Sequence, residues 1–182
     1  MYSDIKKWIN KTGQDFFKRI GISSGQKILD FGCGWGSNTI AISRIVSKNG
    51  CVYAFEKDKD SINKLLDFAD KETVKNIRVI QAEYKTTIPI SDDELDCVLL
   101  YDIIHDHYFD KYKRQLLFKE MERILKKKGL LSIFPHHIIK NEFKEIREEI
   151  IDAGFIYKNK ISDTIIHDSK MITDTIYNFI KK

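Results

Sequence analysis

One apolar run that ends in three closely spaced glycines limits what this chain can fold into. Residues 28–42 read ILDFGCGWGSNTIAI, in which Gly32, Gly34 and Gly36 occupy alternate positions before a helix-forming stretch. Glycine is needed where a chain must turn sharply and let a ligand approach its backbone closely. The stretch therefore predicts a buried strand, a tight ligand-binding turn and a helix, in that order.

Apolar runs and amphipathic stretches alternate along the rest of the chain. Short apolar runs are typical of buried strands, and apolar residues every three to four positions are typical of helices. Five runs are predicted as strands: QKILDFG, CVYAFE, NIRVIQA, LDCVLLY and LLSIFP. Helices are predicted over residues 3–20 with a break at Gly13, from a capping Ser37 to Val46, after a capping Asp58, over 111–128, and after a capping Asn141.

The order of these elements predicts an α/β fold. Nearly continuous apolar strands joined by helices indicate a parallel sheet that is covered on both faces. The last two runs, FIYKNKI and DTIYNFI, alternate with polar positions and are predicted as an antiparallel pair at the sheet edge. We therefore predict a doubly wound, mostly parallel seven-stranded sheet with helices on both faces and an N-terminal helix. Residues 1–182 are expected to form a single domain, with 1–25 as an N-terminal helical segment and 26–182 as the core.

Composition and charge argue against several classes of protein. No apolar run approaches the roughly 18–20 residues that span a bilayer, and the charged N-terminus MYSDIKKWIN is not a signal peptide. The three cysteines form no C-x-x-C pair, which is typical of a cytoplasmic protein with reduced thiols. Residues 1–25 hold five Lys/Arg against two Asp/Glu, and the whole chain carries a net charge of +4. This is too little for the dense basic stripe of a nucleic-acid groove.

Two carboxylates flank the glycine turn and indicate the charge of its ligand. Asp30 precedes the first glycine by two residues, and Glu56 ends the next strand, where a carboxylate can bind both hydroxyls of a ribose. The nicotinamide-cofactor fingerprint G-x-G-x-x-G places its third glycine one residue later than Gly36. A carboxylate beside the turn would repel a pyrophosphate and attract a cation. The expected ligand is a positively charged nucleoside without phosphates, such as S-adenosylmethionine.

The same stretches resemble a known family. DFGCGWG followed by FEKD is similar to motifs I and II of the class I S-adenosylmethionine-dependent methyltransferases. IPISDDELDCVLLYDIIHD resembles the family's fourth-strand region, and LLFKEMERILKKKGLLSI its next helix and fifth strand. The resemblance covers roughly residues 26–135. It implies a Rossmann-like core, S-adenosyl-L-methionine as the cofactor and methyl transfer as the activity.

The resemblance also implies cofactor contacts by position. Asp30 would lie near the methionine amine, and Gly32, Cys33, Gly34 and Gly36 would wrap the cofactor. Glu56 would bind the ribose hydroxyls, with Lys57 beside the adenine. After the third strand, Glu83 or Tyr84 would contact the adenine, and Tyr101 would pass close to the sulfonium and its methyl group.

Four of the five histidines lie in two short clusters. His105 and His107 follow the fourth predicted strand in LYDIIHDHYFD, and His136 and His137 follow the fifth in FPHH. Neighbouring parallel strands place the loops after them along one rim of a sheet. In the resembled family the methyl acceptor sits over these loops, so the two clusters are expected to lie together at the acceptor.

Three roles are open for this histidine-rich region. Histidine can act as a base when the acceptor must lose a proton, and His105, Asp102 and His136 are the catalytic candidates, with His107 and His137 as substrate-binding candidates. A metal site of His105, His107, His136 and His137 with Asp102 suits zinc, iron or nickel and is the less favoured interpretation. The third possibility is loop packing without chemistry.

The expected function is S-adenosylmethionine-dependent methyl transfer to a small-molecule acceptor by a cytoplasmic enzyme. One alternative is a protein or RNA methyltransferase whose basic N-terminal segment touches the partner. Two others are a nucleotide-cofactor oxidoreductase and a non-catalytic protein that binds S-adenosylmethionine. No membrane partner is expected, and the oligomeric state is not predicted.

Overall fold

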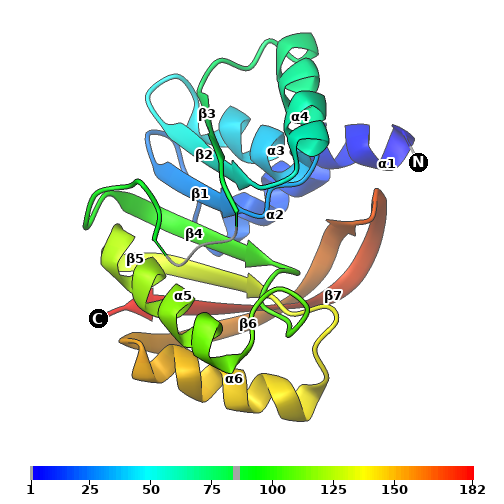
Figure 1. Cartoon of the computed structure of the whole chain (residues 1–182). Coiled ribbons are helices and arrows are strands. Elements are labelled where there is room, and N and C mark those ends of the chain that lie inside the picture. The colour runs from blue at the N-terminus through cyan, green and yellow to red at the C-terminus, as the bar shows by residue number, and fades with distance from the viewer. Residues whose placement is uncertain (1, 84–86) are drawn as a thin grey trace. The chain divides into compact units, whose positions relative to one another are not determined.

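The computed structural model describes residues 2–83 and 87–182 (Figure 1). Its strands form one mixed sheet in the order β3-β2-β1-β4-β5-β7-β6, which confirms the predicted fold class. The strands are β1 (Lys27–Phe31), β2 (Cys51–Glu56), β3 (Ile77–Gln81), β4 (Leu95–Tyr101), β5 (Leu125–Phe134), β6 (Phe155–His167) and β7 (Lys170–Lys181). None of the helices in the described ranges is long and apolar enough to cross a membrane.

The chain divides into two compact units. The first comprises Met1–Glu83 with Ser162–Asp174, and the second comprises Tyr84–Ile161 with Thr175–Lys182. In the first unit β1 pairs in parallel with β2, and β2 with β3. Five of the six residues of β2 are buried, as expected for a strand covered on both faces.

Two helices follow the first two strands, and they begin in different ways. Helix α4 (Lys59–Lys71) begins at Asp58, whose carboxylate accepts a hydrogen bond from the Ser61 N–H at 2.7 Å. This confirms Asp58 as the predicted cap. Helix α3 (Ser37–Val46) has Gly36 at its N-cap, without a side-chain cap. The prediction that Ser37 caps this helix is wrong, because the glycine turn ends at Gly36 and Ser37 is already the first residue of the helix.

The N-terminal helix continues through the position where a break was predicted. α1 (Tyr2–Lys7) runs through a π-helical turn, η1 (Trp8–Thr12), into α2 (Gly13–Ile20). Gly13 has ordinary helical angles, and a Cβ placed on it would lie 2.6 Å from a ring carbon of the fully buried Trp8. Glycine therefore provides space for an aromatic ring here and does not end the helix.

In the second unit β4 pairs in parallel with β5, and β5 pairs antiparallel with β7. The helices of this unit are α5 (Lys111–Ile124) and α6 (Lys140–Asp152). The predicted helix over 111–128 ends four residues early, at Ile124. Residues 125–128 instead begin β5, where Leu125 pairs with Leu95 and the Lys126 ammonium lies 2.7 Å from Asp96. The pairing of Leu125 and Leu130 with β4 on either side of the lysine run overrides the helix preference of lysine.

The C-terminal part also differs in detail from the prediction. Helix α6 has Ile139 at its N-cap, so the predicted cap at Asn141 is wrong. β6 and β7 extend well beyond the predicted strands and are joined by Asp168 and Ser169, which have φ of 45° and 65°. Two consecutive residues with positive φ are typical of a tight hairpin turn whose twist matches that of the strands.

Candidate functional site

The glycine turn after β1 has the backbone that only glycine adopts readily. Gly32, Gly34 and Gly36 have φ of 79°, 52° and 83°, all in the left-handed region where a Cβ is strained. At Gly36 a Cβ would also lie 2.1 Å from the side chain of Leu65 on α4. The predicted sharp turn is therefore present, and at Gly36 it also packs closely against α4.

Asp30 lies in β1 beneath this turn and is almost completely buried, with 2% of its surface exposed. The Thr39 hydroxyl donates a hydrogen bond to its carboxylate at 2.5 Å. Burial, with a smaller contribution from the nearby charge of Glu56, raises the pKa of Asp30 to about 6, although the hydrogen bond from Thr39 lowers it in part. A buried carboxylate without a cationic partner is costly, so this position favours a ligand that brings a positive charge.

Glu56 is buried at the end of β2, and its carboxylate is held by the backbone of the turn. It accepts hydrogen bonds from the N–H groups of Gly34 at 3.0 Å, Lys57 at 2.8 Å and Asp58 at 3.0 Å. The side chain is 5% exposed. Because each carboxylate oxygen has two lone pairs, a ligand hydroxyl can still donate to it. The geometry fits a ribose-binding carboxylate fixed beside the glycine turn.

Cys33 lies inside the turn as a small, buried residue. Burial and the neighbouring Asp30 raise the pKa of its thiol well beyond the usual range, so the sulfur is a neutral thiol and a poor nucleophile. The Gly32 and Cys33 N–H groups both donate to the carbonyl of Phe55 in β2, at 2.8 and 3.0 Å. These bonds tie the turn to the neighbouring strand.

The other predicted adenine contacts lie nearer the surface. Lys57 and Glu83 are exposed, at the ends of β2 and β3, and Tyr84 lies outside the described residues. Trp35, at the tip of the glycine turn, is 49% exposed, and the Lys64 ammonium lies 4.6 Å from the centre of its ring. The roles of Lys57 and Glu83 stay predictions.

In the second unit, Tyr101 is the last residue of β4, and its hydroxyl makes a buried contact with the neighbouring strand β5. The hydroxyl lies 2.9 Å from the Ser132 hydroxyl on β5, and this contact is buried. The ring packs edge-on against Phe134 at 6.0 Å between centroids. A contact of Tyr101 with a cofactor would therefore use the ring, and its role stays a prediction.

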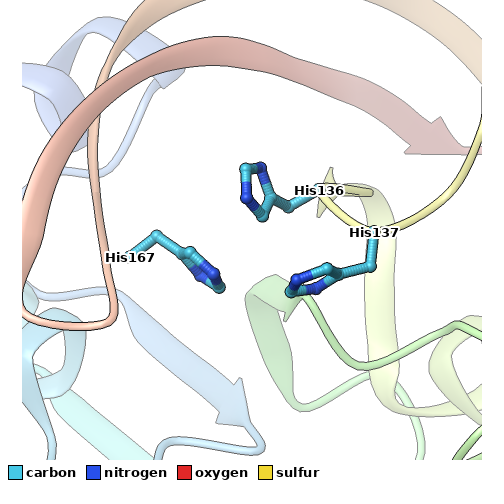
Figure 2. A group of neighbouring side chains, drawn as sticks. All are labelled: His136, His137 and His167. Carbon is cyan, nitrogen blue, oxygen red and sulfur yellow. The ribbon is translucent and has the colours of Figure 1, made fainter.

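The structure brings the two histidine clusters together, because β4 and β5 are neighbours. The His105 ring lies 5.9 Å from that of His137, 6.0 Å from that of His107 and 4.8 Å from that of Tyr108. Figure 2 shows the rings of His136 and His137 on the loop after β5, and their centroids are 4.8 Å apart. The predicted shared location of the clusters is thus observed within this unit.

Asp102 and His137 form a close polar contact in this region. The Nδ1 atom of His137 lies 2.7 Å from one carboxylate oxygen of Asp102 and 2.9 Å from the other. Asp102 follows β4 with a φ of 55°, in the left-handed region that few residues other than glycine adopt. Its N–H donates to the Phe134 carbonyl at 2.8 Å, which holds the residue in this conformation.

The two adjacent histidines have different neighbours. The ring of His136, one of the predicted catalytic candidates, packs against Phe134 at 5.3 Å between centroids, and His137 contacts Asp102. The catalytic roles of His105, Asp102 and His136 stay predictions. Asp102, His105 and His137 also present potential metal-binding atoms within 4.8 Å of one another. The His107 ring packs against that of His105, but His107 is not one of these three residues.

Sequence reasoning missed Arg114, which anchors the loop that carries His105 and His107. This arginine on α5 is 5% exposed and donates to both carboxylate oxygens of Glu149 on α6, at 2.8 and 3.0 Å. It also donates to Asp106 at 2.9 Å. The only local signal was an arginine at a helix position that turns inward, which is not specific, and its partner lies 35 residues away.

Comparisons with known proteins identify the family of the chain. Residues 22–178 match a family model described as "Methyltransferase domain". A demethylmenaquinone methyltransferase of Lactobacillus johnsonii is 26% identical over 171 residues, which cover 91% of this chain and 66% of that protein. A probable cobalt-precorrin-6B C(15)-methyltransferase (decarboxylating) of Sulfurisphaera tokodaii is 32% identical over 76 residues, which cover 42% of this chain. The match spans 40% of that relative's length.

Solved structures show the same fold. A SAM-dependent methyltransferase from Aquifex aeolicus superposes with a TM-score of 0.72 at 19% identity, covering 98% of this chain and 96% of that one. A SAM-dependent O-methyltransferase from Thermotoga maritima gives a TM-score of 0.70 at 15% identity, covering 98% and 71%. At these identities the likeness concerns the fold alone.

Proposed function

Because the chain belongs to the class I S-adenosylmethionine-dependent methyltransferase family, we propose that it transfers the methyl group of S-adenosylmethionine to a small-molecule acceptor in the cytoplasm. The observation that carries this proposal is the left-handed glycine turn between two buried carboxylates, Asp30 and Glu56. A cationic nucleoside complements these charges. A pyrophosphate would be repelled by them, which argues against the oxidoreductase alternative.

The cofactor roles that we propose follow the predicted positions. Asp30 pairs with the ammonium of the methionine moiety, and Glu56 accepts hydrogen bonds from the ribose hydroxyls. The turn supplies backbone contacts through Gly32, Cys33, Gly34 and Gly36. Lys57, Glu83 and Tyr84 are proposed on the adenine side, and Tyr101 near the sulfonium. We also propose that residues 1–182 act as one domain.

The proposed acceptor is a small molecule that contacts the histidine-rich loops after β4 and β5. The names of several relatives specify small molecules, among them a cobalt-precorrin and demethylmenaquinone. The modest positive charge of the chain supports this choice over RNA. We propose that His105, His107, His136 and His137 line the acceptor's surroundings together with Asp102. Methyl transfer is an in-line displacement, so the proposal requires an acceptor held here to reach the sulfonium methyl.

Calorimetric titration tests the cofactor half of the proposal. We expect the protein to bind S-adenosylmethionine and S-adenosylhomocysteine but not NADH. Asp30→Ala and Glu56→Ala should each weaken binding at least tenfold, and Asp67→Asn, an exposed carboxylate on α4, should leave it unchanged. If both alanine variants bind S-adenosylmethionine as the wild type does, the assignment of the cofactor to this turn is wrong.

A labelling experiment tests the acceptor half. Cofactor with an isotopically labelled methyl group is incubated with the protein and with three separate fractions: a deproteinised small-molecule extract, a protein fraction and total RNA. Label should enter the small-molecule fraction. Label in the protein or RNA fraction alone would favour those alternatives, and tight cofactor binding without any label would favour a non-catalytic binding protein.

A further inference from the structure

We infer that His137 is the residue that removes a proton from the methyl acceptor, that Asp102 positions it, and that the acceptor is therefore a protic nucleophile such as a hydroxyl, an amine or a thiol. This inference rests on the proposed function and deepens it. It assigns the base to His137, which was predicted as a substrate-binding residue, and keeps Asp102 from the predicted catalytic set.

The contact between Asp102 and His137 sets the direction of proton transfer. His137 Nδ1 lies within hydrogen-bonding distance of both Asp102 oxygens, at 2.7 and 2.9 Å. A carboxylate can only accept, so Nδ1 carries the hydrogen and the lone pair of the neutral ring lies on Nε2. The same carboxylate stabilises the imidazolium that forms when Nε2 takes up a proton. This pair of side chains is thus arranged as a base with its orienting partner.

The backbone of Asp102 supports a positioning role. A φ of 55° is unusual for a residue with a side chain, and the Asp102 N–H bond to the Phe134 carbonyl holds it there. Strained backbone conformations that the surroundings maintain are common at functional positions. Here the strained residue follows β4 directly, and its carboxylate meets the loop after β5. The side chain of Asp102 is 19% exposed, whereas that of His137 is 56% exposed, so the base remains accessible to a ligand.

The loop on the other side of this pair is anchored as well. Asp106, between His105 and His107, binds the buried guanidinium of Arg114 at 2.9 Å. Arg114 is in turn held by Glu149 at 2.8 Å. An ion pair with a buried arginine fixes the path of the loop, and a preorganised surrounding is what orientation of an acceptor requires.

In the proposed step the acceptor gains a methyl group and loses a proton. The acceptor's heteroatom attacks the methyl carbon, and the bond from that carbon to the sulfonium sulfur breaks, with its electron pair going to sulfur. The cofactor leaves as the neutral thioether S-adenosylhomocysteine. The proton of the acceptor moves to His137 Nε2, so the positive charge passes from the sulfonium to an imidazolium beside Asp102.

Asp102, His105 and His137 could alternatively bind a divalent cation, because their ligand atoms lie within 4.8 Å of one another. The observed contact favours proton transfer, since Nδ1 of His137 already lies on the carboxylate that would have to be shared with the ion. A His–carboxylate contact also occurs at metal sites, where the carboxylate orients the ligand. Metal analysis therefore belongs in the test.

The test follows methyl transfer from labelled S-adenosylmethionine to the small-molecule extract, with mass spectrometry to locate the labelled methyl. Three variants are compared: His137→Ala, Asp102→Asn and the control Asp67→Asn, which changes an exposed carboxylate on α4 in the same way as Asp102→Asn. We expect His137→Ala to lower the turnover rate about 100- to 10,000-fold, with unchanged cofactor affinity and partial rescue by added imidazole. Asp102→Asn should lower the rate without imidazole rescue, and Asp67→Asn should stay within about threefold of the wild type.

The outcomes separate this inference from the proposed function. A labelled methyl on an oxygen, nitrogen or sulfur that carried a proton supports it. A methyl on a thioether sulfur or tertiary amine, or full activity of His137→Ala, would overturn it while leaving methyl transfer intact. A stoichiometric metal that His137→Ala loses, with activity abolished by chelators, would also overturn it. If the wild type labels nothing, the proposed function itself fails.

Discussion

Replacing Asp30 with asparagine should stabilise the protein and at the same time impair its cofactor site. The side chain lies almost wholly buried under the glycine turn, with the Thr39 hydroxyl as its hydrogen-bond donor at 2.5 Å. Asparagine has nearly the same shape and keeps an oxygen that accepts the Thr39 bond. It removes the charge and replaces the second carboxylate oxygen with an amide NH2 group, so the electrostatic contribution is measured by how the effect depends on pH.

The size of the stability gain follows from the pKa. Burial raises the pKa of Asp30 from 3.8 to about 6, and one pKa unit corresponds to about 1.4 kcal/mol. The pKa of Asp30 is higher in the folded than in the unfolded protein, so its ionisation lowers the free energy of unfolding. This loss is absent below about pH 4 and complete above about pH 6. The penalty at pH 8 is about 3 kcal/mol, and about half of it is present at pH 5. For a chain of this size, 1 kcal/mol shifts the melting temperature by ~2–4 °C.

Thermal unfolding of the ligand-free protein, followed by circular dichroism, measures the effect. Asp30→Asn should melt several degrees above the wild type at pH 8, and the gap should narrow at pH 5. Calorimetry should show weakened binding of S-adenosylmethionine. Binding of 5′-methylthioadenosine, which lacks the ammonium group, should change little. For the wild type, S-adenosylmethionine affinity should fall as the pH drops below about 6, because the protonated carboxyl no longer attracts the cation.

Two results would refute this reasoning independently. A variant that is no more stable at pH 8, or whose advantage does not shrink at pH 5, would show that the buried charge carries no penalty. A stabilised variant with unchanged S-adenosylmethionine affinity would show that Asp30 does not meet the ammonium. Asp67→Asn serves as the control for a change of net charge alone.

Three further predictions concern packing and the histidine loop. Gly13→Ala should destabilise the protein by about 1–3 kcal/mol, although alanine is the better helix former, because its Cβ would lie 2.6 Å from the Trp8 ring; a urea melt that shows stabilisation would contradict the packing. Gly36→Ala should abolish cofactor binding and lower the melting temperature, since it combines a left-handed φ of 83° with a 2.1 Å clash; retained affinity by calorimetry would argue against the turn as the binding element. Arg114→Met should cost about 3–5 kcal/mol in urea melts by leaving Glu149 buried without its partner, and Arg114→Met combined with Glu149→Leu should recover most of that loss.

Local patterns in the sequence predicted much of the fold. β2 and β4 coincide with the predicted runs CVYAFE and LDCVLLY, because a strand buried on both faces must be apolar along its whole length. The glycine turn was recognisable for a similar reason, since three left-handed positions leave little choice of residue.

The errors arose where a distant contact overrides local preference. Gly13 looks like a helix break until the buried ring of Trp8 occupies the space of its absent side chain. Lys126–Lys128 look like the end of a helix, but Leu125 before them and Leu130 after them pair with β4, and the lysines form an irregularity within the strand. The ion pair of Arg114 with Glu149 joins two helices through residues 35 positions apart, and a local pattern carries no information on such a pairing.

Three features could be predicted from residue types at short spacing: the α/β fold class, the glycine turn with its two carboxylates, and the histidines after β4 and β5. The contact between Asp102 and His137 became known only from the tertiary structure. His136 and His137 are adjacent and chemically identical, so no sequence pattern separates them. The ring of His136 packs on Phe134, and the left-handed backbone of Asp102 directs its carboxylate to His137.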